Sequence, residues 1–322
     1  MKRCLNCMEE YEEEQAECPF CGWFKAEKKD EALEPGSILQ GRYIVGTVRR
    51  RNCADILYIG WDALFSRKVF IEEYFPKSRT YRLHGETLER FKADDPDVTE
   101  GLNRFIESGQ MLISLDETAG LLPVFAVISE NQTAYMILEY PGDRTLRDVL
   151  ESRAPMTIDE AEKLLMNLSR PLLAAHRNEI YHGQLNLECC YAVPQGKYKI
   201  GDFNDTGVIT QDTGDDHYEA PCPDADIFEL AHIVGAALTG VKLWESRSVD
   251  DNLEKLSNTI PDYVIDALSH ATSENPDVWP SSLRRFVDEF MDEATIELPS
   301  GRVFDEEEQP RKNHVIWKKI FS

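Results

Sequence analysis

Residues 66–76 of this chain have the sequence SRKVFIEEYFP, which predicts a β-strand over residues 68–75. Its apolar and aromatic residues are of the types that pack well in a pleated sheet. A second strand-like stretch precedes it from Arg42 to about Leu57, where β-branched and aromatic residues recur. We therefore expect this part of the chain to form a sheet.

Downstream of that run, the sequence predicts one helix and two further strands. The helix is expected over residues 99–115, which carry apolar residues at helical spacing. The strands are expected over residues 123–129 and 133–139, on either side of a polar turn at residues 130–132. Strands, one helix and more strands make a small, sheet-dominated lobe.

The rest of the chain is predicted to be mostly helical. Thr157-x-x-Glu160 is a capping-box pattern in front of an apolar stripe, which marks the start of a long helix. Two brief strands are expected within residues 181–203. Further helices are expected over residues 227–238, 263–271 and 283–291. The expected fold class is therefore α+β.

Four of the eight cysteines form two C-x-x-C pairs near the start of the chain: Cys4 and Cys7, then Cys18 and Cys21. Two such pairs can place four thiolates tetrahedrally around one Zn²⁺. A segment this short has no core of its own, so the metal would supply its folding energy. The alternatives are a redox pair and a disulfide framework, and a reducing compartment disfavours the latter. We predict a structural zinc ribbon.

The composition changes at three points along the chain. Residues 1–24 are the predicted ribbon, and residues 25–40 mix Lys, Glu, Ala, Pro and Gly without a period, which is typical of a linker. Residues 41–293 carry the predicted strands and helices. Residues 294–322 form a tail that is first acidic and then basic and aromatic, and contact between this tail and a membrane stays open.

The net charge of −24 is the outlying bulk property. Such a surface repels phosphate backbones and anionic lipids, so we expect no nucleic-acid partner, although the charge could serve solubility alone. No stretch approaches the roughly 18–20 consecutive apolar residues of a membrane span. The first residues lack the apolar region of a signal peptide, so we expect a cytoplasmic protein.

Several short motifs follow one another in a fixed order. Residues 132–140 (QTAYMILEY) come first, then Tyr181-His182 and residues 201–204 (GDFN), and finally Ala220-Pro221 and residues 226–230 (DIFEL). Together with residues 66–76, they resemble bacterial serine/threonine protein kinases that carry an N-terminal zinc ribbon. The resemblance covers about residues 41–292. It implies a bilobal protein kinase-like fold with a β-rich N-lobe and an α-helical C-lobe.

The resemblance also identifies the positions at which kinases bind ATP phosphates, and this chain has other residues there. The glycine-rich-loop positions hold Arg50, Asn52 and Asp55, which bring side chains to where phosphate would lie. Glu72 replaces the strand lysine and reverses its charge. Ser108 replaces the helix glutamate that usually pairs with this lysine. We expect neither ATP nor Mg²⁺ to bind.

The catalytic-loop positions differ as well. Gln184 stands at the aspartate base and cannot accept a proton. Cys189 stands at the metal-binding asparagine, although Mg²⁺ prefers oxygen ligands. Asp202 of the D-F-G motif is retained, but one carboxylate alone is a poor Mg²⁺ site. Both halves of an ion pair of the helical lobe are replaced, by Cys222 and Trp279.

These replacements predict a catalytically inactive kinase homologue, a pseudokinase. It would act as a regulatory or scaffold protein for a protein partner, with an active kinase as one candidate. The alternative is a divergent kinase or nucleotidyl transferase that keeps some ATP binding, with a cation from residues 49–51 in place of the lysine. We also predict that one of these three arginines pairs with Glu72, and that the acidic segment 205–226 receives a basic partner.

Overall fold

The structure, a computed structural model, describes residues 1–24, 31–82, 85–115, 120–153, 155–203, 221–245 and 247–291. These residues divide into two compact units. The first unit holds the described residues up to 115 together with Leu122–Tyr140. The second holds residues 120–121, Pro141–Phe203 and the described residues from 221 onward. Among the described helices, none is both long enough and apolar enough to cross a membrane.

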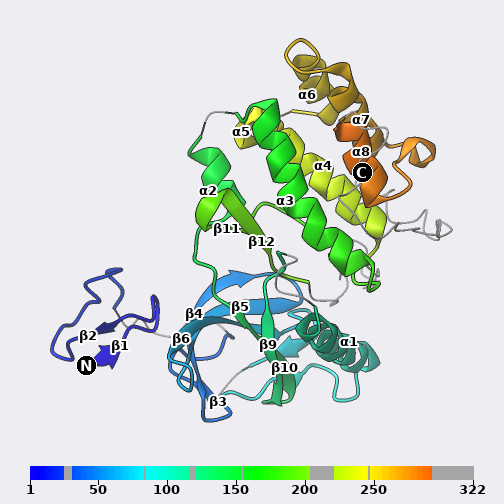
Figure 1. The fold of residues 1–322 in the computed structure, drawn as a ribbon. Helices are drawn as coiled ribbons and strands as arrows, with labels where there is room; N and C mark the ends of the chain where they lie inside the picture. The colour runs from blue at the N-terminus through cyan, green and yellow to red at the C-terminus, as the bar shows by residue number, and fades with distance from the viewer. Residues whose placement is uncertain are drawn as a thin grey trace. The chain divides into compact units, whose positions relative to one another are not determined.

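A six-stranded sheet is the centre of the first unit (Figure 1). Its order is β3-β4-β5-β6-β10-β9, and every neighbouring pair is antiparallel. The strands predicted over residues 68–75, 123–129 and 133–139 are confirmed, and the earlier strand-like stretch forms β4 and the start of β5. The strands are β3 (Ile38–Leu39), β4 (Tyr43–Arg51), β5 (Asp55–Asp62), β6 (Arg67–Tyr74), β9 (Val124–Glu130) and β10 (Thr133–Glu139).

One helix and two short hairpins accompany this sheet. Helix α1 (Pro96–Ile113) confirms the predicted helix and packs on β9 and β10. A Cβ atom on Gly109 would lie 2.7 Å from a methyl carbon of Val127, so glycine allows this close approach. The hairpins are β1 (Lys2–Arg3) with β2 (Glu10–Tyr11), and β7 (Thr80–Tyr81) with β8 (Glu89–Arg90).

The structure differs from the linker predicted over residues 25–40 in the second part of that range. Residues 25–30 lie outside the described residues, whereas residues 31–40 pack on the sheet. Ala32 and Leu33 are buried in the core of the first unit, and Ile38–Leu39 is the edge strand β3, paired with β4. A two-residue strand has no period that sequence analysis could detect.

The second unit is mostly helical, as predicted (Figure 1). Strands β11 (Cys190–Val193) and β12 (Lys197–Ile200) form the hairpin expected within residues 181–203. Short 3-10 turns lie at Pro194–Gly196 and Pro276–Val278. The helices are α2 (Leu146–Glu151), α3 (Ile158–His176), α4 (Pro223–Thr239), α5 (Val241–Glu245), α6 (Val249–Leu256), α7 (Asp262–Thr272) and α8 (Leu283–Phe290). Sequence analysis missed α2 and α5, because helices of five or six residues carry less than two turns of apolar periodicity, and it also missed α6.

Helix α3 begins at the capping box that the sequence contains. The hydroxyl of Thr157 accepts a hydrogen bond from the backbone N–H of Glu160 at 3.4 Å, and the Glu160 carboxylate accepts one from the Thr157 N–H at 3.0 Å. The apolar stripe that follows is buried, as predicted, at Leu164, Leu165, Leu168 and Leu172. This helix is therefore fixed both at its N-terminus and along its apolar face.

Two predicted surfaces lie largely outside the described residues. The tail, residues 294–322, does so entirely, and the acidic segment 205–226 does so up to residue 220. Asp226 is described, and it is completely buried in the second unit. The prediction that the acidic segment offers its carboxylates to a partner is therefore wrong at Asp226, because this side chain is used inside the fold.

Candidate functional site

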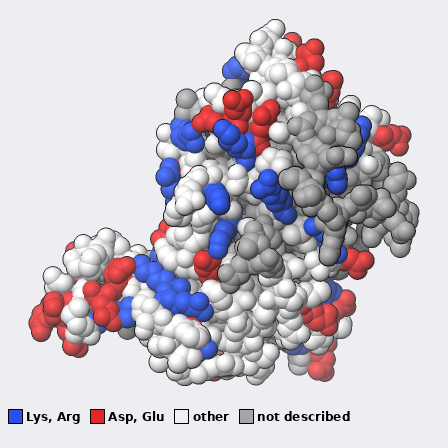
Figure 2. All heavy atoms as spheres, viewed as in Figure 1, with Lys and Arg blue, Asp and Glu red and all other residues white. Residues whose placement is uncertain are grey.

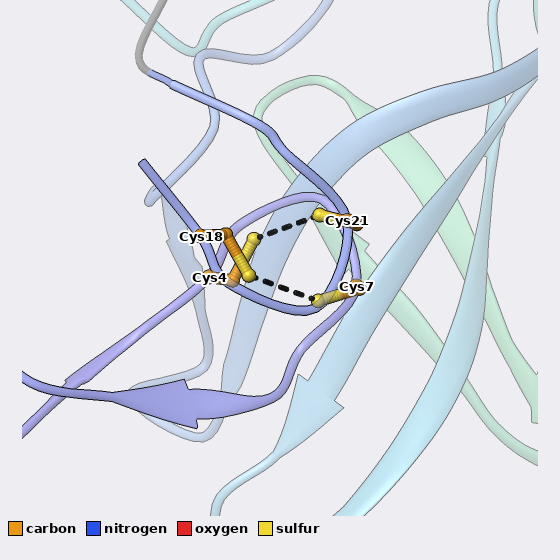
Figure 3. A group of neighbouring side chains, drawn as sticks. All are labelled: Cys4, Cys7, Cys18 and Cys21. Carbon is orange, nitrogen blue, oxygen red and sulfur yellow. Dashed lines mark hydrogen bonds between the residues drawn. The ribbon is translucent and has the colours of Figure 1, made fainter. Parts of the chain in front are cut away.

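The amino-terminal segment brings four cysteine side chains together (Figure 3). Their sulfur atoms all lie within 4.8 Å of one another, and Cys4–Cys21 and Cys7–Cys18 are each separated by 3.6 Å. In a tetrahedral zinc site with Zn–S bonds of about 2.3 Å, the sulfurs stand about 3.8 Å apart. The four cysteines predicted from their spacing thus fit a single metal ion.

Both cysteine pairs use the same backbone turn. The N–H of Met8 donates to the carbonyl of Cys4 at 2.9 Å, and the N–H of Gly22 donates to the carbonyl of Cys18 at 2.8 Å. The residue after each second cysteine has a positive φ, 60° at Met8 and 69° at Gly22. Glycine adopts this conformation without strain, which favours Gly22 at the second turn.

The thiols differ in how readily they lose a proton. Burial raises the pKa of Cys4 and of Cys7. Burial also acts on Cys21, but hydrogen bonds from the Asn6 side chain and the Trp23 backbone outweigh it and lower the pKa to about 7. Because a metal binds thiolates, its binding must displace the protons that remain.

Residues 50–55, called the hairpin loop below, comprise the end of β4, the turn at residues 52–54 and the start of β5, and they include the positions that the kinase resemblance assigned to a glycine-rich loop. The side chain of Asn52 closes this loop: its Oδ1 accepts hydrogen bonds from the N–H groups of Ala54 at 2.9 Å and Asp55 at 2.7 Å. The carbonyl of Ala54 in turn accepts a hydrogen bond from the N–H of Phe75 at 2.7 Å. In kinases, backbone amides of this loop approach the phosphates, and here two of them already bond a side chain.

Glu72 lies on β6 in the same row of the sheet as Arg50. The strand register pairs Arg50 with Leu57 and Leu57 with Glu72, which puts the three side chains on one face. Arg50 reaches over Leu57, and its Nη2 lies 3.7 Å from Glu72 and 3.6 Å from Asp55. Both carboxylates are buried. The prediction that an arginine from residues 49–51 pairs with Glu72 is confirmed for Arg50.

The next residue on β6, Glu73, faces the opposite side of the sheet and also has an arginine. Arg82 donates to its carboxylate, and neither side chain is exposed to solvent. The hydroxyl of Tyr58 donates to the same carboxylate at 2.6 Å. Sequence analysis missed this pair, because Arg82 lies beyond β6 and only the fold brings it back. Ser108, at the position of the usual helix glutamate, is buried on α1.

The catalytic-loop positions, residues 181–189, lie in the second unit and are held by Asp226 of α4. Its carboxylate accepts hydrogen bonds from the backbone N–H of His182 at 2.9 Å and of Gly183 at 2.6 Å, and it lies 2.8 Å from His176 Nε2. The His182 ring contacts the Gly201 carbonyl through Nε2 at 2.9 Å. This buried carboxylate fixes the backbone of the loop, a role that sequence analysis did not assign to it.

The residues that replace the catalytic groups differ in their surroundings. Gln184 is exposed. Cys189 is completely buried, and its thiol donates to the carbonyl of Asn186 at 3.1 Å. Asp202 has a φ of 66°, a conformation that is uncommon for any residue except glycine. Of the replaced ion pair, Cys222 precedes α4, and the Trp279 indole donates to the carbonyl of Ser273 at 2.7 Å.

Comparison with solved structures identifies the fold as that of a protein kinase domain. The apo form of PpkA-294 matches with a TM-score of 0.62 and 19% identity, over 81% of this chain and 99% of that one. The kinase domain of Mycobacterium tuberculosis PknI matches with a TM-score of 0.58 and 18% identity, over 82% and 100% of the two chains. The predicted α+β protein kinase-like fold is confirmed.

Curated relatives are protein kinases too. Serine/threonine-protein kinase PrkC of Bacillus subtilis is 22% identical over 285 residues, which are 83% of this chain and 39% of PrkC. The carbon catabolite-derepressing protein kinase of Candida tropicalis is 24% identical over 168 residues, 47% of this chain and 27% of that protein. The chain thus spans well under half the length of these relatives. It matches no protein-family model.

Proposed function

We propose that this chain, which has the protein kinase-like fold and bacterial serine/threonine kinases among its relatives, is a pseudokinase that acts through protein contacts. The hairpin loop carries this proposal. The amides of Ala54 and Asp55 bond Asn52, and the carboxylate of Glu72 faces Arg50. An ATP phosphate would have to displace these interactions and to approach two buried carboxylates, which repel it.

The replaced catalytic groups support the same proposal. Phosphoryl transfer depends on groups that position the phosphates, the Mg²⁺ ions and the attacking hydroxyl. Loss of a general base alone costs roughly 10²- to 10⁴-fold in rate, and Gln184 offers no base. Cys189 turns its thiol toward a backbone carbonyl of its own loop. We propose that the fold serves as a regulatory or scaffold surface in the cytoplasm, and that an active kinase is the partner class to test first.

The first test is nucleotide binding by the full chain. With millimolar ATP and either Mg²⁺ or Mn²⁺, we expect the melting temperature to change by less than about 1 °C, since a ligand that binds only the folded state must raise it. An active bacterial serine/threonine kinase, measured under the same conditions, is the positive control. A shift of several degrees would contradict the proposal.

The retained Asp202, with its unusual backbone conformation, favours one alternative: a divergent kinase or nucleotidyl transferase. This alternative requires that label from γ- or α-labelled ATP enters the protein or a substrate. It also requires that Asp202→Ala abolishes the labelling. If wild type and Asp202→Ala are equally unlabelled while the control kinase is labelled, the alternative is excluded.

We further propose that the metal held by the four cysteines is a structural Zn²⁺. A set of four cysteine sulfurs suits Zn²⁺, and the ribbon core consists of little more than the cysteines, Tyr11 and Trp23. Elemental analysis of natively purified protein is expected to give one zinc per chain. The paired variant Cys18→Ser/Cys21→Ser is expected to give none, and metal-free wild-type protein would overturn the assignment.

A further inference from the structure

Asn6 connects the cysteine cluster to the sheet. It lies between Cys4 and Cys7, and its backbone N–H and its side-chain Nδ2 point to two sulfur atoms, those of Cys4 at 3.4 Å and Cys21 at 3.5 Å. Its side-chain oxygen accepts hydrogen bonds from Thr47 Oγ1 at 2.7 Å and from Arg49 at 3.3 Å. One amide thus bonds a candidate metal ligand with one end and strand β4 with the other.

The neighbouring backbone makes the same connection. The carbonyl of Leu5 accepts a hydrogen bond from the N–H of Thr47 at 2.8 Å. A Cβ atom on Gly46 would stand 2.4 Å from this carbonyl and 2.3 Å from the Met8 side chain. Only glycine permits so close an approach, so β4 has the residue that docking of the ribbon requires.

Charged side chains extend the contact to β5 and β6. Lys68 Nζ lies 2.6 Å from Glu9, and the Arg3 guanidinium lies 3.5 Å from the ring of Trp61. Figure 2 shows acidic side chains gathered over the region of β1 and β2, with basic side chains next to them. These charged and hydrogen-bonded contacts depend on orientation, so their strength depends on the geometry of the ribbon.

Strand β4 is irregular at the place where the ribbon contacts it. Its pairing with β5 shifts register between Val45 and Val48 and again between Val48 and Arg50. Such bulges leave backbone groups outside the ladder, and the N–H of Thr47 goes to the ribbon instead. The ribbon therefore completes the part of β4 that leads into the hairpin loop.

We propose that the ribbon is a metal-dependent clamp on β4, in which Asn6 couples the cysteine cluster to Thr47 and Arg49. The ribbon has almost no apolar core, so loss of the metal unfolds its turns. The hydrogen bonds that the Asn6 side chain and the Leu5 carbonyl accept from Thr47 and Arg49 are then lost, and the amides of β4 become free to exchange. Metal supply would thus control the hairpin loop that carries Arg50. This inference does not rest on the absence of phosphoryl transfer.

Hydrogen exchange of the full chain tests the clamp. After zinc is removed with a chelator, we expect amides of residues 43–51 to exchange at least 10-fold faster, while those of α7 keep their rate. Asn6→Ala with one zinc still bound is expected to accelerate the same amides. Gln15→Ala, an exposed change on the same ribbon, is the matched control and should match wild type. Unchanged exchange of β4 after zinc removal would overturn the proposal.

If Asn6→Ala does not bind zinc, two variants outside the metal site test the proposal in its place. Thr47→Val and Arg49→Met remove the partners of Asn6 from the β4 side. Because coupling between two sites is reciprocal, both are expected to weaken zinc affinity several-fold, as measured by competition with a chelator at equilibrium. Arg51→Met, on the same strand with an exposed side chain, is the control. Wild-type zinc affinity in both test variants would show that the ribbon and β4 are independent.

Discussion

The hairpin loop in the first unit and the 181–189 loop in the second are the two places where the kinase resemblance predicts replaced residues, and their backbones are stabilised in different ways. In the hairpin loop, the replacing residues Arg50, Asn52 and Asp55 themselves make the stabilising contacts. In the 181–189 loop, the backbone is held by Asp226, whereas the replacing residue Gln184 is exposed. The side chains at the predicted replacement positions thus stabilise the hairpin loop themselves. The 181–189 loop is stabilised by Asp226 instead, and its side chain at position 184 is exposed.

The sequence alone does not show whether a residue at such a position contributes to stability or is merely exposed. Where the side chain makes stabilising contacts, its substitution should lower the free energy of unfolding. Where the side chain is exposed and other groups hold the backbone, its substitution should change that free energy little. The following variants test this distinction, starting with the largest expected effect.

Asp226→Ala should have the largest effect. It removes the acceptor of two backbone N–H groups and of His176 from a fully buried site. Buried donors without partners cost about 1–3 kcal/mol each, so we expect a loss of about 4 kcal/mol in chemical denaturation. Asp266→Ala, exposed on α7, is the control and should stay within about 0.5 kcal/mol of wild type.

If Asp226→Ala does not fold, Asp226→Asn keeps one acceptor oxygen and should lose about half as much stability. A loss of stability below about 1 kcal/mol in Asp226→Ala would contradict the conclusion that Asp226 stabilises the backbone of the 181–189 loop.

Arg50→Met tests the hairpin loop. It leaves the buried carboxylates of Glu72 and Asp55 without their nearby guanidinium. Removal of one partner from a buried ion pair costs about 3 kcal/mol, which urea denaturation would measure. Addition of Glu72→Leu to this variant should restore at least half of the loss, because it removes one of the two charges. Arg51→Met is the exposed control on the same strand, and an equal loss there would remove the special role of Arg50.

The region around Asp226 should also depend on pH, through the neighbouring carboxyl group of Glu229 on α4. Burial, with a smaller contribution from Asp226, raises the pKa of Glu229 to about 7. The folded state then binds a proton that the unfolded state releases, so stability falls as pH rises from about 4.5 to about 7. The fall is on the order of 3 kcal/mol, from about 2.5 pKa units at about 1.4 kcal/mol each. Glu229→Gln should lose this fall, Glu254→Gln should keep it, and identical pH profiles of the two variants would contradict the assignment.

Local sequence patterns predicted what local forces determine. The C-x-x-C pairs, the Thr157 capping box and the strands on either side of residues 130–132 depend on neighbours within a few residues, and all were found. Contacts that depend on the tertiary fold were missed. Arg82 reaches Glu73, Asn6 reaches Thr47, and Asp226 reaches the 181–189 loop only after distant segments have packed. The pairing of an arginine with Glu72 was predicted because a buried carboxylate needs a partner and three arginines stand at residues 49–51, and the strand register of the fold selects Arg50.

The smallest effects are expected of two restorations, Asn52→Gly and Gln184→Asp, which together test the comparison most directly. Asn52→Gly restores the residue type of a glycine-rich loop, yet it removes the oxygen that bonds the amides of Ala54 and Asp55. Loss of these partly exposed bonds and the added chain freedom of glycine should cost about 1 kcal/mol. Gln184→Asp, the matched restoration in the 181–189 loop, should cost less than about 0.5 kcal/mol, because this side chain is exposed.

Neither restoration should raise the melting temperature in the presence of ATP and Mg²⁺, because Glu72 and Cys189 remain. Denaturation curves of the two variants, measured side by side, give the difference in stability. If Asn52→Gly proves as stable as wild type while Gln184→Asp lowers stability, the conclusion is reversed. The hairpin loop would then tolerate substitution, and the 181–189 loop would be the one whose stability depends on its own side chain.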